Sequence, residues 1–379
     1  MKFTIKATSL KDALTKATGH LKKAETIPVL AYVHLESVGE NAIRITGTNL
    51  DVAVRVEVSA NIEKSGTACA PGIRLLDLVR TLDEDVAISI DDNDWVSVKS
   101  GTAKFRLPAV SSEQFPDTPF LVKKDISVPA KMFRDFIRLS SFAITTAPSR
   151  FTLSGAKLEV SAGQMRMVTT DGDRLALAHA EIATGGEVSC LIPKLALGRI
   201  SRIIDPKDGD IEIGEDQHHV FLVQGDWTMA ARKLSGSFPN YEMVLPKDLD
   251  NSATLDAKRF GEALNRATLI ANSHSEDLKK GHIAVKLTAG GVEVTANAGQ
   301  EGEGGDAFAA EYSGDDITLK YQSRYVRQFL DVALGMDVED GEAVTPSVVV
   351  SFNDALSASE FGIPRGMDYQ YRYILMPLR

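Results

Sequence analysis

The stretch Gln164-Met165-Arg166-Met167-Val168-Thr169-Thr170-Asp171-Gly172-Asp173-Arg174-Leu175-Ala176-Leu177 indicates how the chain folds. Apolar residues alternate with other residues on both sides of its centre, Thr170 to Asp173. The Asp-Gly pair supplies the positive φ that a short chain reversal requires. The pattern therefore predicts a β-hairpin with a tight turn around Asp171 and Gly172.

This hairpin has a counterpart about one third of the chain away on each side, at residues 45–54 (ITGTNLDVAV) and 294–300 (VTANAGQ). Residues 130–133 (AKMF) likewise recur as 257–260 (AKRF), and 115–117 (FPD) recur as 238–240 (FPN). A chain of 379 residues exceeds what one core usually supports. We therefore expect three tandem copies of one domain, at 1–122, 123–250 and 251–379, with turn-rich joints at 116–119 and 246–252.

Each copy contains two segments with helical periodicity among alternating, strand-like runs. In the first copy, Leu10, Leu14 and Leu21 share one helical face. Pro71 and Pro193 precede the second segment in copies one and two, which suits a helix start. The expected helices are 10–23, 73–82, 131–143, 194–204, 257–270 and 323–334. The predicted class is α+β, with two helices packed on β-sheets in each copy and more strand than helix.

The composition is that of an ordinary globular protein, with 44% hydrophobic and 25% charged residues. No stretch has the length of a signal peptide's apolar region or of a membrane span, so a cytoplasmic location is expected. The two cysteines, Cys69 and Cys190, lie in apolar segments of different copies. They are expected to be reduced core residues, with a disulfide disfavoured.

The charge distribution is uneven along the chain. A net charge of −10 argues against nucleic-acid binding when averaged over the protein. The six expected helices, however, contain 17 Lys and Arg residues and only five Asp and Glu residues. Helices lining one surface would offer phosphates a basic track without reading base sequence. The alternative is that each helix has a solvated basic face and the protein is a scaffold that does not bind DNA.

Several motifs, in chain order, resemble the bacterial sliding clamp family, the β subunit of DNA polymerase III. They are 1–5 (MKFTI), 26–30 (TIPVL), 46–50 (TGTNL), 170–175 (TDGDRL), 238–241 (FPNY) and 373–379 (YILMPLR). The resemblance implies a replicative processivity factor and not an enzyme: a homodimeric ring of six domains that encircles duplex DNA, with helices lining the hole. The implied partners are duplex DNA, bound without sequence preference, the polymerase III catalytic subunit, the clamp loader and other proteins with a clamp-binding motif. No membrane, cofactor or metal is implied.

By position, the resemblance also implies a pocket for short partner peptides between the second and third domains. Its residues are Leu153, Thr170, Gly172, Arg174, Leu175, Pro239, Val244, Ile374, Leu375, Met376 and Pro377, with Arg150, Tyr325 and Ser357 at a second lobe. Apolar Leu, Val, Ile and Met side chains suit the Leu and Phe anchors of a linear motif. The alternative for residues 374–378 is a last core strand.

Two further sets of residues are expected to contact DNA and a second copy of the chain. The DNA-facing residues are Lys11, Lys22, Lys23, Arg74, Arg80, Arg134, Arg138, Arg199, Arg202 and Arg266. The dimer interface is expected to join Lys99, Lys104, Phe105, Arg106 and Leu107 of copy one to Leu269, Ile270, Glu301 and Glu303 of copy three. Opposite charges that flank apolar residues favour such a heterologous contact.

The sequence departs from the family pattern at several positions. Asp173 stands where family members often have His, and Met243 where some have Arg, so the pocket is expected to prefer different motifs. Ala24 stands where a DNA-contacting Arg can occur, which leaves Lys22 and Lys23 as the contacts of that loop. Residues 361–368 look like an insertion before the last strand.

The rival class is a metal-dependent hydrolase that uses Asp171 and Asp173, or the acidic run Asp91, Asp92 and Asp94. Neither run continues as a calcium-binding loop. The glycines at 299, 302, 304 and 305 are not followed by the Gly-Lys-Ser/Thr sequence of a phosphate-binding loop. The histidine pair His218-His219 has no further Cys or His residues at zinc-ligand spacing. We therefore expect neither metal nor cofactor.

Overall fold

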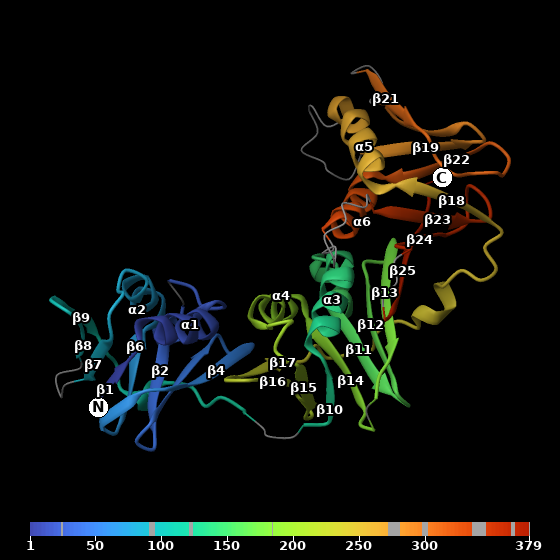
Figure 1. Cartoon of the computed structure of the whole chain (residues 1–379). Helices are drawn as coiled ribbons and strands as arrows, with labels where there is room; N and C mark the ends of the chain where they lie inside the picture. Colours follow the sequence, from blue (N-terminus) through green and yellow to red (C-terminus); the bar gives the residue numbers. More distant parts are fainter. Residues whose placement is uncertain are drawn as a thin grey trace. The chain divides into compact units, whose positions relative to one another are not determined.

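The computed structural model describes residues 1–23, 26–90, 95–120, 124–183, 185–271, 281–297, 302–335, 346–364 and 368–378. The chain forms two compact units. The first comprises residues 1–134, 160–162 and 183–234, and the second 135–159, 163–182 and 235–379. The described ranges contain the six α-helices and more strand than helix, which confirms the α+β class (Figure 1). No helix in these ranges is long and apolar enough to cross a membrane.

The first unit contains two antiparallel sheets. One has the order β5-β1-β7-β8-β9, formed by Asn61–Lys64, Lys2–Ile5, Val86–Ile90, Trp95–Ser100 and Ala103–Pro108. The other has the order β10-β15-β16-β17-β4-β3-β2-β6, formed by Ile126–Pro129, Asp210–Glu215, His219–Gln224, Trp227–Arg232, Val52–Ser59, Ala42–Thr48, Tyr32–Val38 and Thr67–Pro71. β17 pairs with β4, so strands from two sequence repeats share this sheet.

The helices of the first unit are α1 (Ala7–Thr18), α2 (Gly72–Val79) and α4 (Lys194–Ile203), and β14 (Val188–Pro193) precedes α4. α1 packs against α2 and against β3 and β4 (Figure 1). Leu10 and Leu14 of α1 are fully buried, as their helical spacing predicts. α1 ends earlier than expected because Gly19 is its C-cap.

The second unit also contains two sheets. One includes the consecutive strands β12-β13-β25-β24-β23-β18, formed by Gln164–Thr170, Arg174–Glu181, Gln370–Leu375, Ser359–Gly362, Ser347–Phe352 and Asn251–Asp256. The other has the order β21-β20-β19-β22, formed by Glu303–Phe308, Gly291–Asn297, His282–Thr288 and Ile317–Gln322. α5 (Ala257–Ala271) packs on α6 (Ser323–Leu334), β20 and β21. α3 (Ala130–Ser140) and β11 (Gly155–Ser161) occupy the stretches where the chain passes from one unit to the other.

The predicted hairpin is confirmed, and its turn recurs in the first repeat. Thr170 pairs with Leu175 across the β12–β13 turn, as Thr48 pairs with Ala53 across the β3–β4 turn. In both turns the threonine hydroxyl accepts a hydrogen bond from the N–H two residues later, at 3.0 Å in the first case and 3.1 Å in the second. The donor residues have positive φ, 97° at glycine 172 and 74° at leucine 50. Shared side-chain and backbone geometry therefore accompanies the sequence repeat.

The structure adds detail to two expectations about the later part of the chain. Phe361 is fully buried in β24 and pairs with Tyr373 of β25, so the 361–368 segment begins within a core strand. Residues 365–367 lie outside the described ranges. Within the joint expected at 246–252, Asn251 and Ser252 already belong to β18. The alternating strand Ser359–Gly362 is short, which is why its sequence pattern was missed.

Both cysteines are buried, which confirms that they are core residues, and both are free thiols in the structure. Burial raises the pKa of the Cys69 thiol to about 12. A thiol with such a pKa is protonated at neutral pH and therefore a poor nucleophile.

Candidate partner-binding site and basic surface

The β12–β13 turn is fixed by its own side chains. Asp171 Oδ1 accepts hydrogen bonds from the backbone N–H groups of Asp173 (3.1 Å) and Arg174 (3.2 Å). Gly172 has φ of 97°, and a Cβ at this position would lie 2.4 Å from Arg150 Nη1. The turn therefore requires glycine at its exposed tip. The carboxylate of Asp171 has a structural role here because it organises the reversal.

Arg174 lies at the centre of a buried hydrogen-bond network and is only 6% exposed. Its Nε donates to Asp171 Oδ2 (2.9 Å), its Nη1 to Gln328 Oε1 (2.7 Å) and its Nη2 to the carbonyl of Phe142 (2.8 Å). The Tyr325 ring centroid lies 4.2 Å from the guanidinium carbon. The network joins the β12–β13 turn to α6 and to the segment after α3.

The surroundings of Arg174 and Tyr325 shift the pKa of both side chains. Burial alone would lower the pKa of Arg174, but Tyr373 and Asp171 offset this effect and the pKa is raised. Burial and the charge of Asp171 raise the pKa of Tyr325. The Tyr325 hydroxyl donates to Asp173 Oδ2 at 3.3 Å. A raised pKa keeps Arg174 a cation and Tyr325 a neutral hydroxyl donor, so both can donate charge-assisted hydrogen bonds to the turn carboxylates.

A buried apolar cluster lies beside the turn and is formed by Val168, Leu175, Leu177, Tyr241 and Ile374. Leu175 pairs with Ile374 between β13 and β25, which brings the C-terminal strand to the hairpin. Phe238, Leu245 and Ala358 pack against the cluster. The segments that contain residues 238–245 and 356–358 therefore pack on this apolar cluster.

Four large apolar side chains that lie within two positions of a cluster residue, or of a residue packed on the cluster, remain exposed. Met243 is 82% exposed, Val244 55%, Leu356 67% and Met376 48%. Met243 and Val244 lie in η5 (Tyr241–Val244), and the Met376 N–H donates to the carbonyl of Asp173 at 3.2 Å. Exposed apolar residues gathered at a buried cluster indicate a binding surface more strongly than scattered ones do.

All 14 residues predicted for the partner pocket belong to the second unit. The exposed ones are Arg150, Gly172, Pro239, Val244, Ser357 and Met376. Thr170 and Pro377 are half-buried. The buried ones are Leu153, Arg174, Leu175, Tyr325, Ile374 and Leu375. The buried side chains can shape the surface, whereas the exposed ones are free to contact a partner.

Sequence reasoning missed several residues of this site. Tyr241 belongs to the Phe-Pro-Asn-Tyr motif that was recognised, but its cluster partners are distant in sequence. Gln328 and Phe142 contact Arg174 from other elements and carry no local signal. Leu356 is a lone exposed leucine in the β23–β24 loop, where no periodicity marks it.

Most of the predicted DNA-facing residues are accessible. Lys11, Lys22, Lys23, Arg74, Arg80, Arg202 and Arg266 are exposed, and Arg134 and Arg138 are half-buried. Arg266 forms ion pairs with Asp306 and, at 3.6 Å, with Glu262, which reduces its free charge. Ala24 lies outside the described residues.

The prediction for Arg199 was wrong. The residue is 6% exposed, and its Nη2 donates to the carbonyls of Thr15 (2.8 Å) and Lys16 in the last turn of α1. Burial and the charge of Arg202 lower its pKa to about 10. The last carbonyls of a helix have no partner within the helix, and Arg199 satisfies two of them. Arg199 is therefore a structural contact between α4 and α1.

The described residues predicted for the dimer interface lie on β8, on the edge strands β9 and β21, and on α5. Lys99, Lys104, Phe105 and Arg106 are exposed and Leu107 is half-buried, on β8 and the edge strand β9. Glu303 is exposed at the start of the edge strand β21, and Leu269 on α5 is 72% exposed. Glu301 and the side chain of Ile270 lie outside the described residues.

Within the described ranges, no group of three or more His, Cys, Asp or Glu side chains is arranged to hold a metal ion. The acidic run 91–94 lies outside those ranges. Of the other two candidate ligands, Asp171 has its carboxylate engaged by Arg174 and the turn N–H groups, and Asp173 Oδ2 accepts from the Tyr325 hydroxyl.

Known proteins match the chain along its length. Family models for the DNA polymerase III β subunit match in succession: the N-terminal domain at residues 1–119, the central domain at 127–240 and the C-terminal domain at 242–379. The β sliding clamp of Pseudomonas putida is 28% identical over 387 residues, with all of both chains covered. That of Pseudomonas aeruginosa is 29% identical over 340 residues, which cover 88% of this chain and 90% of the relative.

The fold comparison agrees with these matches. The crystal structure of the Pseudomonas aeruginosa DnaN sliding clamp bound to griselimycin has a TM-score of 0.89 at 26% identity, with 100% of this chain and 99% of that chain covered. The three tandem clamp domains and the resemblance are therefore confirmed. The family is a non-catalytic replication factor, so the hydrolase and scaffold alternatives are not favoured. The chain belongs to the DNA polymerase III β-subunit family, the bacterial sliding clamps.

Proposed function

We propose that two copies of the chain close into a cytoplasmic ring around duplex DNA, and that partner proteins bind the exposed apolar surface of the second unit. The partners include the polymerase III catalytic subunit and a clamp loader. The carrying observation is that Met243, Val244, Leu356 and Met376 are exposed around one buried apolar cluster. Domain boundaries near 122/123 and 250/251 are part of the proposal.

The ring seam is proposed to join β9 of one copy to β21 of the next. Each is the edge strand of its sheet, and an edge strand presents unpaired backbone groups that a second strand can bind. Lys104 and Arg106 on β9 are positive, whereas Glu303 on β21 is negative; Asp306, also on β21, is paired with Arg266 within the chain. This charge complementarity favours the head-to-tail pairing over self-pairing of either edge.

Calorimetric titration with a short peptide that carries adjacent Leu and Phe anchors tests the partner site. The intact protein should bind it saturably, and a variant that lacks residues 376–379 should lose most of the affinity. Met376→Asp should act similarly, because a charge on the apolar surface disfavours burial of the anchors. Leu195→Asp is the matched control, since Leu195 is 63% exposed but lies in the first unit. Unchanged affinity in both site variants would contradict the assignment.

A further inference from the structure

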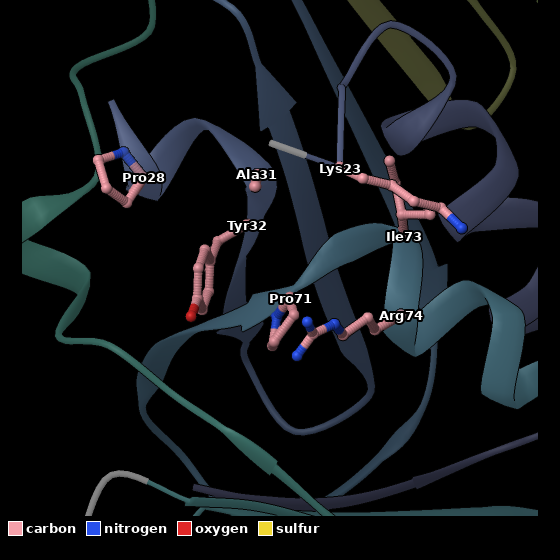
Figure 2. A pocket seen from close by; sticks show the side chains of 7 residues that line it. All are labelled: Lys23, Pro28, Ala31, Tyr32, Pro71, Ile73 and Arg74. Carbon is pink, nitrogen blue, oxygen red and sulfur yellow. The ribbon is translucent and has the colours of Figure 1, made fainter. Parts of the chain in front are cut away.

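A surface cavity of about 340 Å³ lies in the first unit, where the start of α2 meets η1 (Pro28–Ala31). None of the residues proposed for the partner site lines it. Its walls come from Lys23, Pro28, Tyr32, Pro71, Ile73 and Arg74 (Figure 2). The cavity therefore combines two cations with an aromatic ring and apolar side chains.

The charge of this cavity favours an anion. Arg74 is exposed and, among the residues that the structure describes, has no hydrogen-bond or ion-pair partner. Figure 2 shows its side chain extending toward Pro71 and Tyr32. Lys23 Nζ lies 3.6 Å from Asp77 Oδ2 and is partly neutralised. Arg74 is thus the uncompensated cation, and the adjacent start of α2 adds partial positive charge.

The apolar part of the cavity is built on regular backbone structure. Tyr32 is half-buried, and its backbone pairs with Pro71 between β2 and β6, which positions its Cα. Pro28 begins η1, and its pyrrolidine ring restricts the backbone at the opposite wall. A half-buried tyrosine ring offers a planar ligand an aromatic face for stacking. The volume is within the range of small-molecule sites.

We infer that this cavity binds one nucleotide of single-stranded DNA, with the base against Tyr32 and the phosphate at Arg74. The inference rests on the proposed function, which places DNA in contact with the basic helices. Stacking on an aromatic ring combined with a backbone cation is how proteins bind single strands without sequence preference. A duplex, whose bases are already stacked, would use Arg74 and leave Tyr32 without a role.

Fluorescence anisotropy of a short labelled oligothymidylate, titrated with the full-length protein, tests this site. Wild type should bind saturably, Tyr32→Phe should bind equally well, and Tyr32→Leu should bind at least about fivefold more weakly. Arg74→Glu should weaken binding more than Arg80→Glu does. Arg80 is the matched control because it is exposed on the same helix region but pairs with Asp77 and does not line the cavity.

Two results would overturn the inference. One is no saturable binding by wild type. The other is equal losses for the two arginine variants together with full affinity of Tyr32→Leu, which would indicate general charge attraction only. Peptide titration of the same preparations separates this test from the proposed function, because the partner site lies in the second unit. Retained peptide binding without oligothymidylate binding would contradict the nucleotide site and leave the proposed partner site unchanged.

Discussion

Arg174 Nε and Asp171 Oδ2 form an ion pair at 2.9 Å, although only 4% of the arginine side chain and 11% of the aspartate side chain are exposed. The two residues are three positions apart in one turn, and Asp171 also accepts two backbone hydrogen bonds of that turn. The pair therefore fixes the hairpin tip next to the exposed Met376, whose N–H donates to the carbonyl of Asp173.

Replacement of Arg174 by Ala should destabilise the protein by about 3–5 kcal/mol, because it leaves a buried carboxylate without its cation. Urea unfolding measures the change. Arg166→Ala on the same hairpin is the control, since its ion pair with Glu242 at 3.2 Å is exposed and worth at most about 1 kcal/mol. Similar losses in the two variants would show that the buried network does not stabilise the turn.

His20 gives stability a specific pH dependence. Burial and the nearby charge of Arg199 lower its pKa to about 4, and its Nε2 lies 3.1 Å from the carbonyl of Gly47. In the unfolded chain the pKa of His20 is about 6.5, so between pH 4 and about 6.5 the unfolded state binds more protons than the folded state does. The free energy of unfolding should therefore fall as the pH decreases from about 6.5 to 4. His20→Gln should flatten this part of the curve in denaturant titrations. An equally steep decrease in the variant would assign the effect to other groups.

Several features could be predicted from the sequence because they are local. Alternation predicted the Gln164–Thr170 and Arg174–Glu181 strands, and the 3.6-residue period predicted all six helices. The positions of the arginine side chains could not be predicted in this way. Arg174 donates a hydrogen bond to Gln328, which is 154 positions away in the sequence, and Arg199 donates one to Thr15, which is 184 positions away. An arginine on a helix or at a turn has the same local pattern whether it faces solvent or caps a distant carbonyl.

Leu269→Asp, combined with Ile270→Asp, should convert dimers to monomers. Leu269 is 72% exposed on α5, so a charge there costs little in the free chain but must be desolvated in a heterologous interface. Native mass spectrometry measures the outcome. Leu356→Asp, at a position that is 67% exposed but outside the proposed seam, should leave the mass unchanged. A dimeric mass for the double variant would place the interface elsewhere.

Reversal of Lys11, Arg80 and Arg202 to Glu should prevent stable association with DNA. All three residues are exposed on or beside the basic helices, and removal of each cation that binds a phosphate should reduce the salt dependence of binding by about one unit of slope. Binding measured over a series of salt concentrations tests this. Lys286→Glu, on the exposed side of β19, is the control and should behave as wild type. Equal effects of both changes would indicate charge attraction spread over the whole surface.

Topological retention on DNA tests the central claim most directly. The protein is loaded onto a nicked circular plasmid with a clamp loader and passed through a sizing column at high salt, before and after the plasmid is cut once. Encirclement predicts that the protein elutes with circular DNA and is released from the linear form, because a ring is held by topology and screening removes surface attraction. Equal retention on circular and linear DNA, or release from both, would contradict the account.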